Sequence, residues 1–204
     1  YDMCYEYEGF QVGVTDPLLG SCSSKAAAKG NAVYIINAKT GALIWSASSD
    51  GSATNTVSTM TNSVVAGITT LDRDNDGFMD HIYFADLGGQ VFRADFTNAG
   101  FVKPSTSPTS TSSPETSFSN TRVTLLLQGA FTGTEKKFNH RFYERPSVSF
   151  YRNPTSNTLF ALVNVISGDR SSPLSKIRDI SKADRLYGII DSDVTKQNDV
   201  FYAN

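Results

Sequence analysis

Short apolar runs separated by turn-forming residues are the main pattern along this chain. Residues 32–36 and 42–45 flank Lys39-Thr40-Gly41, which predicts a β-hairpin with Gly41 in the left-handed conformation. A second hairpin is predicted over 81–96, around the turn Leu87-Gly88-Gly89-Gln90 with its paired glycines. Further strands are predicted over 64–72, 122–131, 146–152, 158–168 and 187–191, with a turn at 153–157. We therefore expect an all-β fold, either a sandwich or part of a β-propeller.

Three segments interrupt this pattern. Residues 46–63 are mostly small and polar and predict a connecting loop. Residues 103–120 contain three prolines and many serines and threonines, and they predict a flexible insertion that cannot bury enough apolar surface to offset its ordering entropy. Residues 171–187 have helical spacing, with Ser172 before Pro173 as the cap. We expect a single domain over 1–204 with at most one or two short helices.

Composition and charge narrow the classes of partner. The 204 residues carry a net charge of −2, which gives no reason to expect nucleic acid or an anionic membrane as a partner. A basic group interrupted by glutamates predicts a solvated loop; its members are Lys136, Lys137, His140, Arg141 and Arg145. No apolar run is long enough for a transmembrane segment. Because Tyr1 is not a start methionine, we expect a piece of a longer protein.

The two cysteines leave an alternative open. Cys4 and Cys22 enclose a turn-rich loop that a disulfide would close, and a reduced pair fits the spacing as well. The two histidines lie far from both cysteines in the sequence, so a zinc site is not predicted.

The stretch DRDNDGFMD at 72–80 is the strongest candidate for chemistry. Its carboxylates occupy loop positions 1, 3, 5 and 9, Gly77 occupies position 6, and Phe78 at position 7 offers a backbone carbonyl. Calcium loops present oxygen ligands from these positions, and the glycine permits the sharp turn. Position 12 is Tyr83 and a strand follows, so this is a calcium loop on a β scaffold and not an EF-hand. The predicted ligands of Ca²⁺ are Asp72, Asp74, Asp76, Phe78 and Asp80.

Other interpretations of the acidic stretch and of the remaining polar residues are weaker. Magnesium would require stricter octahedral geometry than a calcium loop. The two carboxylates of a glycosidase would come from separate elements and not from one loop. A solvated turn favours aspartate but does not require carboxylates and glycine at the positions of a calcium loop. His81 and His140 have no catalytic partner in any recognised motif, and Asp191 and Asp193 are expected in loop or turn roles. Trp45 is expected to pack at the end of its strand. We therefore predict no catalytic residues and a non-enzymatic protein.

Two parts of the chain resemble one known family. VYIINAKTGALIW is similar to the repeat of quinoprotein-type β-propellers. DRDNDGFMDHIYFADLGGQVFRADF resembles the calcium-loop blade of the PilC/PilY family of type IV pilus biogenesis proteins and tip adhesins. RPSVSFYRNPTSNTLFALVNVISGDRSSPLS and DRLYGIIDSDV resemble its C-terminal blades. The matching positions of the calcium-loop blade are Tyr83, Asp86, Gly89, Arg93, Asp95 and Phe96.

The resemblance implies a partial or modified β-propeller of the quinoprotein-like type, located on the bacterial fimbrium or cell surface, outer membrane-associated or secreted. It also implies that calcium binding supports pilus extension against retraction, twitching motility and host-cell adhesion. Implied partners are pilus subunits or minor pilins, with a host-cell receptor as a further one. In that oxidising setting the Cys4–Cys22 disulfide is favoured. Two alternatives remain open, a quinone-dependent dehydrogenase propeller and a generic integrin-like or lectin-like calcium-dependent adhesion module.

Overall fold

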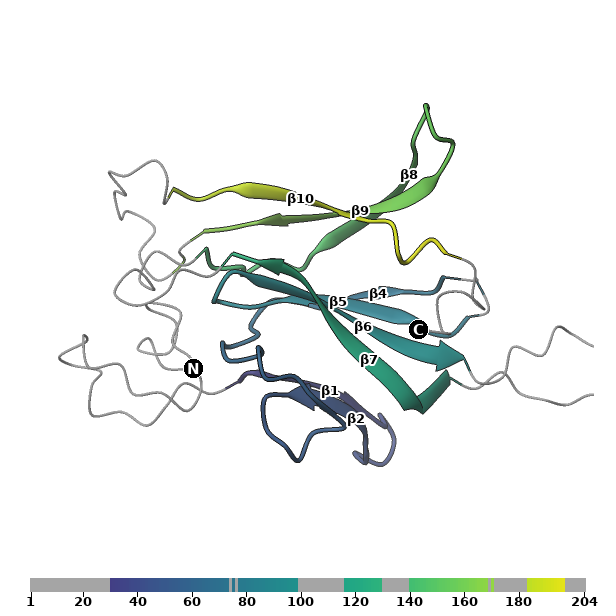
Figure 1. The fold of residues 1–204 in the computed structure, drawn as a ribbon. Coiled ribbons are helices and arrows are strands. Elements are labelled where there is room, and N and C mark those ends of the chain that lie inside the picture. Colours follow the sequence, from purple (N-terminus) through teal and green to yellow (C-terminus); the bar gives the residue numbers. More distant parts are fainter. Residues whose placement is uncertain are drawn as a thin grey trace, which may run out of the picture.

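The computed structural model describes residues 30–73, 75, 77–98, 116–129, 140–168, 170 and 183–196. Within them the chain is all-β, and none of the described residues is helical (Figure 1). The strands are β1 (Ala32–Ile36), β2 (Leu43–Ser48), β3 (Asn55–Thr56), β4 (Thr69–Leu71), β5 (His81–Ala85), β6 (Gln90–Asn98), β7 (Thr116–Gln128), β8 (Ser147–Arg152), β9 (Leu159–Ile166) and β10 (Leu186–Asp191).

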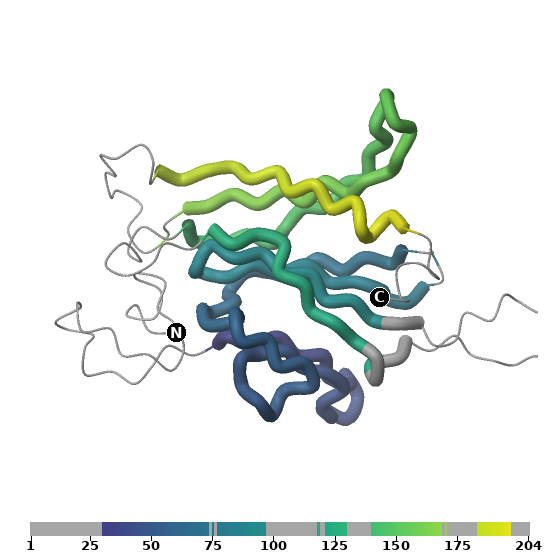
Figure 2. The backbone as a smooth tube through the Cα atoms, viewed as in Figure 1, coloured from purple at the N-terminus to yellow at the C-terminus, as the bar shows by residue number. Residues whose placement is uncertain are grey.

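The described strands form three open sheets that follow one another along the chain. The first has the order β1-β2-β3, with β3 parallel to β2; the second has β4-β5-β6-β7 and the third β10-β9-β8, both antiparallel. The β4–β7 sheet lies between the other two, as the ribbon and the backbone tube both show (Figures 1 and 2). Short turns join β1 to β2, β5 to β6 and β8 to β9, as the sequence pattern predicts.

Two apolar layers hold the three sheets together. One lies between the first and second sheets and contains Trp45, Phe84, Phe92 and Phe96, all fully buried. The other lies between the second and third sheets and contains Tyr83, together with Val163 and Val165 of β9. Because successive residues of a strand point to opposite faces, β5 contributes to both layers, and all five of its residues are buried. The middle sheet is therefore covered on both faces.

The two outer sheets expose apolar residues on the faces turned away from the middle sheet. On β10, Leu186 and Ile190 are 72% and 68% exposed, and the paired Ile166 of β9 is 56% exposed. On β1, Tyr34 and Ile36 are 62% and 57% exposed. No residue on the outward face of β8–β10 is charged; the set is Ser147, Ser149, Tyr151, Phe160, Leu162, Asn164, Ile166, Leu186, Gly188 and Ile190.

The turns follow the sequence prediction closely. Gly41 has φ 73°, as expected for the left-handed position, and its amide donates to Asn37 O. Gly89 has φ 85° in the turn between β5 and β6. Between β8 and β9, the turn at 153–157 ends with Asn157 at φ 56°, whose amide donates to Asn153 O. Local chemistry therefore fixed the positions of these three reversals.

Several predicted boundaries are wrong. The strand expected over 64–72 is only Thr69–Leu71, and the loop expected over 46–63 begins with the end of β2 and contains β3. Residues 116–120 of the predicted flexible insertion belong to β7, where Phe118 packs on Phe96 with ring centroids 5.3 Å apart. Residues 186–187 of the predicted helix lie in β10. Residues 183–185 of the predicted helix are described and are not helical. Residues 171–182 of that helix, residues 103–115 of the insertion and both cysteines lie outside the described residues.

Candidate functional site

The acidic stretch connects β4 to β5, and its last residue is built into the sheet. Asp80 is 2% exposed; its amide donates to Leu71 O at 2.9 Å and its carbonyl accepts from the Phe96 amide at 2.8 Å. These bonds continue the pairing of β4, β5 and β6 by one residue beyond the strands. The C-terminal end of the loop is therefore held by the core of the middle sheet.

Hydrogen bonds also close the loop on itself. Asp72 Oδ2 accepts from the Gly77 amide at 2.9 Å, and Asp80 Oδ2 accepts from the Arg73 amide at 2.6 Å. Gly77 has φ 92° and Asn75 has φ 61°, so the reversal uses two left-handed residues. The glycine at position 6 makes the sharp turn that the sequence predicted.

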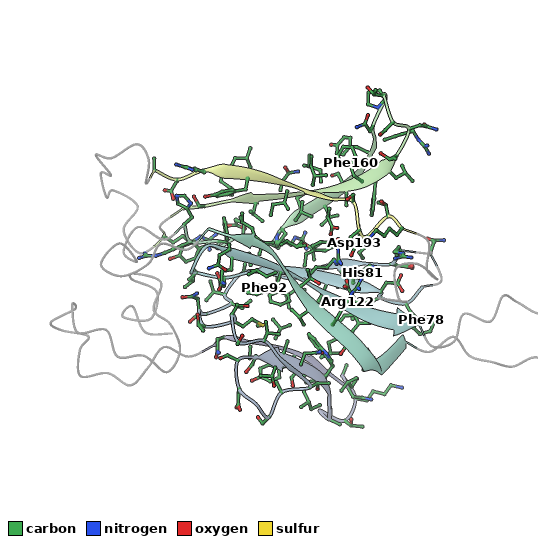
Figure 3. All side chains as sticks on the ribbon, in the orientation of Figure 1. Phe78, His81, Phe92, Arg122, Phe160 and Asp193 are labelled. Carbon is green, nitrogen blue, oxygen red and sulfur yellow. The ribbon has the colours of Figure 1, made fainter. Side chains whose placement is uncertain are left out.

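The structure describes only part of the predicted ligand set. Asp72 and Asp80 lie at the two ends of the closed loop. Phe78, labelled in Figure 3, is 39% exposed. Asp74 and Asp76 lie outside the described residues. No group of three or more potential metal ligands gathers among the residues that are described. The assignment of these five residues to Ca²⁺ therefore stays a prediction.

A buried ion-pair network begins at the residue after the loop. His81 Nδ1 lies 2.8 Å from Asp95 Oδ1, and Arg93 Nε donates to the same oxygen at 2.7 Å. Arg122 Nε donates to Asp95 Oδ2 at 2.7 Å. His81 pairs with Asp95 and Tyr83 with Arg93 across β5 and β6, so these side chains share the face turned towards the third sheet.

Arg93 carries the network across to the third sheet. It is 1% exposed, and its Nη1 donates to both carboxylate oxygens of Asp191, at 2.8 and 2.7 Å. Its Nη2 donates to Asp193 Oδ2 at 2.9 Å, and the Tyr83 hydroxyl donates to Asp191 Oδ2 at 3.1 Å. Figure 3 shows His81, Arg122 and Asp193 gathered between the two sheets. Arg93 is therefore the hub that joins β6 to the end of β10.

Charge and burial oppose one another in this network. Burial favours the neutral form of Asp95, but the His81 and Arg93 hydrogen bonds outweigh it and lower the pKa of Asp95. Burial also disfavours the charge on Arg93, yet Asp95 and Asp191 raise its pKa. Burial, followed by the charge of Asp191, raises the pKa of Tyr83. Tyr83 is therefore a neutral donor, and Arg93 and Asp95 stay charged.

The turn between β5 and β6 holds a second buried carboxylate, Asp86. Its Oδ1 accepts from the amides of Gly88 and Gln90, at 2.9 and 2.8 Å. Gly89 is confined by backbone, because a Cβ placed there would lie 3.1 Å from His140 O. Desolvation raises the pKa of Asp86 from 3.8 to about 7. Asp86 and Gly89 thus shape the hairpin turn between β5 and β6.

The segment predicted as a solvated basic loop is partly buried. His140 and Arg141 are each 3% exposed, and His140 Nδ1 contacts the Tyr187 hydroxyl. Burial, and then the charge of Arg185, lower the pKa of His140. The prediction is wrong at these two positions because the segment runs between the hairpin turn and β10, where it is shielded from solvent. Lys136 and Lys137 lie outside the described residues.

Two expectations about single residues have clear outcomes. Trp45 is fully buried and packs edge-on against Phe96, with ring centroids 5.0 Å apart, so its packing role is confirmed. Asp191 is 4% exposed and bound by Arg93, so it has a structural role at the end of a strand and not in a loop. No helix among the described residues is long and apolar enough to cross a membrane.

These features define a class: an all-β domain of stacked open sheets that are joined by a buried arginine–aspartate network. No family model and no curated protein matches the chain. Among solved structures, it is similar to the crystal structure of the Pseudomonas aeruginosa PilY1 C-terminal domain, with 23% identity and a TM-score of 0.52. The match covers 84% of this chain and 33% of that chain. The chain thus shares the fold of part of a PilY1-type domain, which confirms the predicted resemblance at the level of the fold.

Proposed function

We propose that this chain is a calcium-binding, non-enzymatic part of a type IV pilus-associated protein at the bacterial surface. Its role would be to support pilus extension against retraction, twitching motility and host-cell adhesion, with pilus subunits or minor pilins as partners. The observation that carries the proposal is the fold shared with the PilY1 C-terminal domain over 84% of the chain.

The anchoring of the acidic loop supports calcium as the ligand. Asp72 and Asp80 stand at its two ends, and each has one carboxylate oxygen bonded to a loop amide. Those bonds fix the loop ends before an ion arrives. Four carboxylates in nine residues repel one another, and a divalent cation with oxygen ligands would remove that repulsion.

The exposed outer faces support a partial β-propeller. Antiparallel sheets that face water on one side usually alternate apolar and polar residues, whereas the β8–β10 sheet presents uncharged, largely apolar residues on its outward face. The β1–β2 sheet likewise exposes Tyr34 and Ile36. Blades of a propeller are covered by neighbouring blades on both faces. Each outer sheet would therefore pack against a further blade of the longer protein.

Calcium binding is tested by terbium luminescence and by calorimetry on the full chain. Asp72→Asn keeps an oxygen for the Gly77 amide but removes one charge, so we expect weaker binding with little loss of fold. Asp50→Asn is the matched control, because Asp50 is exposed and its Oδ1 accepts from the Ser52 amide in a turn outside the loop. Calcium binding unchanged by Asp72→Asn and by Asp76→Ala would refute the assignment.

The pilus role is tested separately in the source bacterium. Replacing the chromosomal copy with the Asp72→Asn variant should reduce twitching motility and surface piliation, while Asp50→Asn should not. A variant that loses calcium in vitro but leaves piliation, motility and adhesion at wild-type levels would separate the ion from the pilus function.

The propeller is tested by placing a charge on an outer face. Ile190→Lys should leave the unfolding free energy of the isolated chain unchanged within about 0.5 kcal/mol, because Ile190 is already 68% exposed there. The same substitution should destabilise the longer protein, where a neighbouring blade would bury the lysine. Equal effects in both would contradict the packing of a further sheet on this face.

A further inference from the structure

The β5–β6 hairpin turn is the place where segments from all three sheets meet. The Leu87 amide donates to Ser63 O at 2.9 Å, and this bond joins the turn to the segment that follows β3. The Phe142 amide donates to Asp86 O at 3.2 Å, and the Gly129 amide donates to Gly89 O at 2.9 Å. These bonds attach the segment that leads into β8 and the end of β7. We name this set of contacts the junction.

A carboxyl group sits at the centre of the junction without a countercharge. Asp86 is fully buried and forms no ion pair with any described residue. Its Oδ1 accepts two amides of its own turn, whereas its Oδ2 has no hydrogen-bond partner among the described residues. The neighbouring Asn62 amide, 3% exposed, lies beside this carboxyl group, and Asn62 Oδ1 also lacks a partner. A neutral carboxyl group suits this site better than an ionised one.

No ion pair to Asp86 is found among the described residues, and no charged neighbour is among the causes of its raised pKa. The turn itself and the Asn62–Ser63 segment contribute no charged residue, and neither do Gln128 and Gly129. His140 and Arg141 are the titratable or charged residues on the segment that leads into β8. His140 contacts the Tyr187 hydroxyl, and burial lowers its pKa, so it is neutral near pH 7.

We propose that Asp86 is a proton-operated clamp: when neutral it holds residues 62–63 and 140–142 on the β5–β6 hairpin, and when ionised it loosens them. Ionisation leaves a buried carboxylate whose hydrogen bonds from the described residues are those of the Gly88 and Gln90 amides, both to Oδ1, with the Asn62 side chain beside it. Water reaches the charge most readily if Leu87 and Phe142 release their bonds, because these link the turn to the flanking segments and not to itself. The junction therefore tightens in mildly acidic surroundings and opens in alkaline ones.

The sign of the pH dependence follows from the two protonation states. The folded chain holds the Asp86 proton up to about pH 7, whereas the unfolded chain releases it near 3.8. Stability from Asp86 is thus present at low pH and is lost as pH rises from about 4 to about 7. The unfolding equilibrium constant should rise through this window by up to about a thousandfold from Asp86 alone. His140 acts with the opposite sign below pH 6.5, so the two must be separated by variants.

Asp86→Asn separates them, because asparagine keeps the acceptor for Gly88 and Gln90 but cannot ionise. Chemical unfolding of the wild-type chain and of this variant, from pH 5 to pH 8.5, gives the difference between their unfolding free energies as a function of pH. We expect the unfolding free energy of the variant, relative to that of the wild type, to increase as pH rises to about 7. Above pH 7 the difference between the two unfolding free energies should stay constant. A difference that stays constant from pH 5 to pH 8.5 would overturn the proposal.

Amide hydrogen exchange distinguishes a clamp from a merely buried acid. In the wild type, the protection factors of the Leu87 and Phe142 amides should fall above pH 7, while that of Ile82 within β5 should change less. In Asp86→Asn all three should be independent of pH. If the variant does not fold, the chemical shift of the Asp86 carboxyl carbon in the wild type is followed by NMR as a function of pH. A titration midpoint below pH 5 would refute the clamp.

Discussion

Arg93→Met removes the hub between the second and third sheets while keeping an unbranched side chain of similar length. Asp95 would retain His81 and Arg122, but among the residues that the structure describes Asp191 would keep only the Tyr83 hydroxyl and the Val194 amide. A buried carboxylate left without its cation costs about 3–5 kcal/mol. We therefore expect the unfolding free energy to fall by about that amount.

The assay is urea unfolding at pH 7, followed by fluorescence and circular dichroism. Arg152→Met is the matched control, because Arg152 is exposed. Its Nη1 donates to the backbone carbonyl and the side-chain oxygen of Asn157, in a turn at the surface. Its cost should stay within about 0.5 kcal/mol. The double variant Arg93→Met/Asp191→Asn should recover part of the loss, since it removes the stranded charge. A loss below about 1 kcal/mol for Arg93→Met, or no coupling with Asp191, would refute the hub.

Three further predictions concern turns, core and acid stability. Gly89→Ala should destabilise the chain more than Gly41→Ala in urea unfolding: both glycines have positive φ, which costs about 1–2 kcal/mol, but only Gly89 is confined by backbone. Trp45, the single tryptophan, should emit at short wavelength and shift to the red on unfolding, and Trp45→Phe should cost about 1–3 kcal/mol because the Nε1 donor to Asn55 is lost. Because the pKa of Asp95 is lowered on folding, its contribution to stability should be present above about pH 4 and be lost in acid, as an acid titration of the folded signal would show.

Most of the fold prediction came from sequence patterns that span only a few residues. Turn residues with special backbone conformations, such as Gly41 and Gly89, identified the reversals, and alternating apolar runs identified the strands. The shorter elements were missed because nothing local marks them. The β3 strand pairs in parallel with β2 through only two residues, and a pairing of that length has no sequence signal.

The candidate site was predictable only where its residues are close in sequence. The register of 72–80 gave the acidic loop and the turn at Gly77. The ion-pair network was not found by pattern, although the family resemblance pointed to Arg93 and Asp95, because their partner Asp191 lies on another sheet. The burial of His140 and Arg141 was missed for the same reason. A basic stretch is expected in solvent unless the tertiary fold covers it.

The bond between Arg93 and Asp191 spans 98 positions along the chain. During synthesis the middle sheet can pair as soon as β7 is made, but Arg93 meets its bidentate carboxylate only when β10 emerges. A chain that ends before Asp191 would carry a buried arginine with Asp95 as its remaining strong acceptor on the same sheet. Such long-range closure is slow and leaves intermediates exposed. A chain truncated before β10 is therefore expected to be cut faster by proteases than one that contains it, because Arg93 would lack its partner on the third sheet.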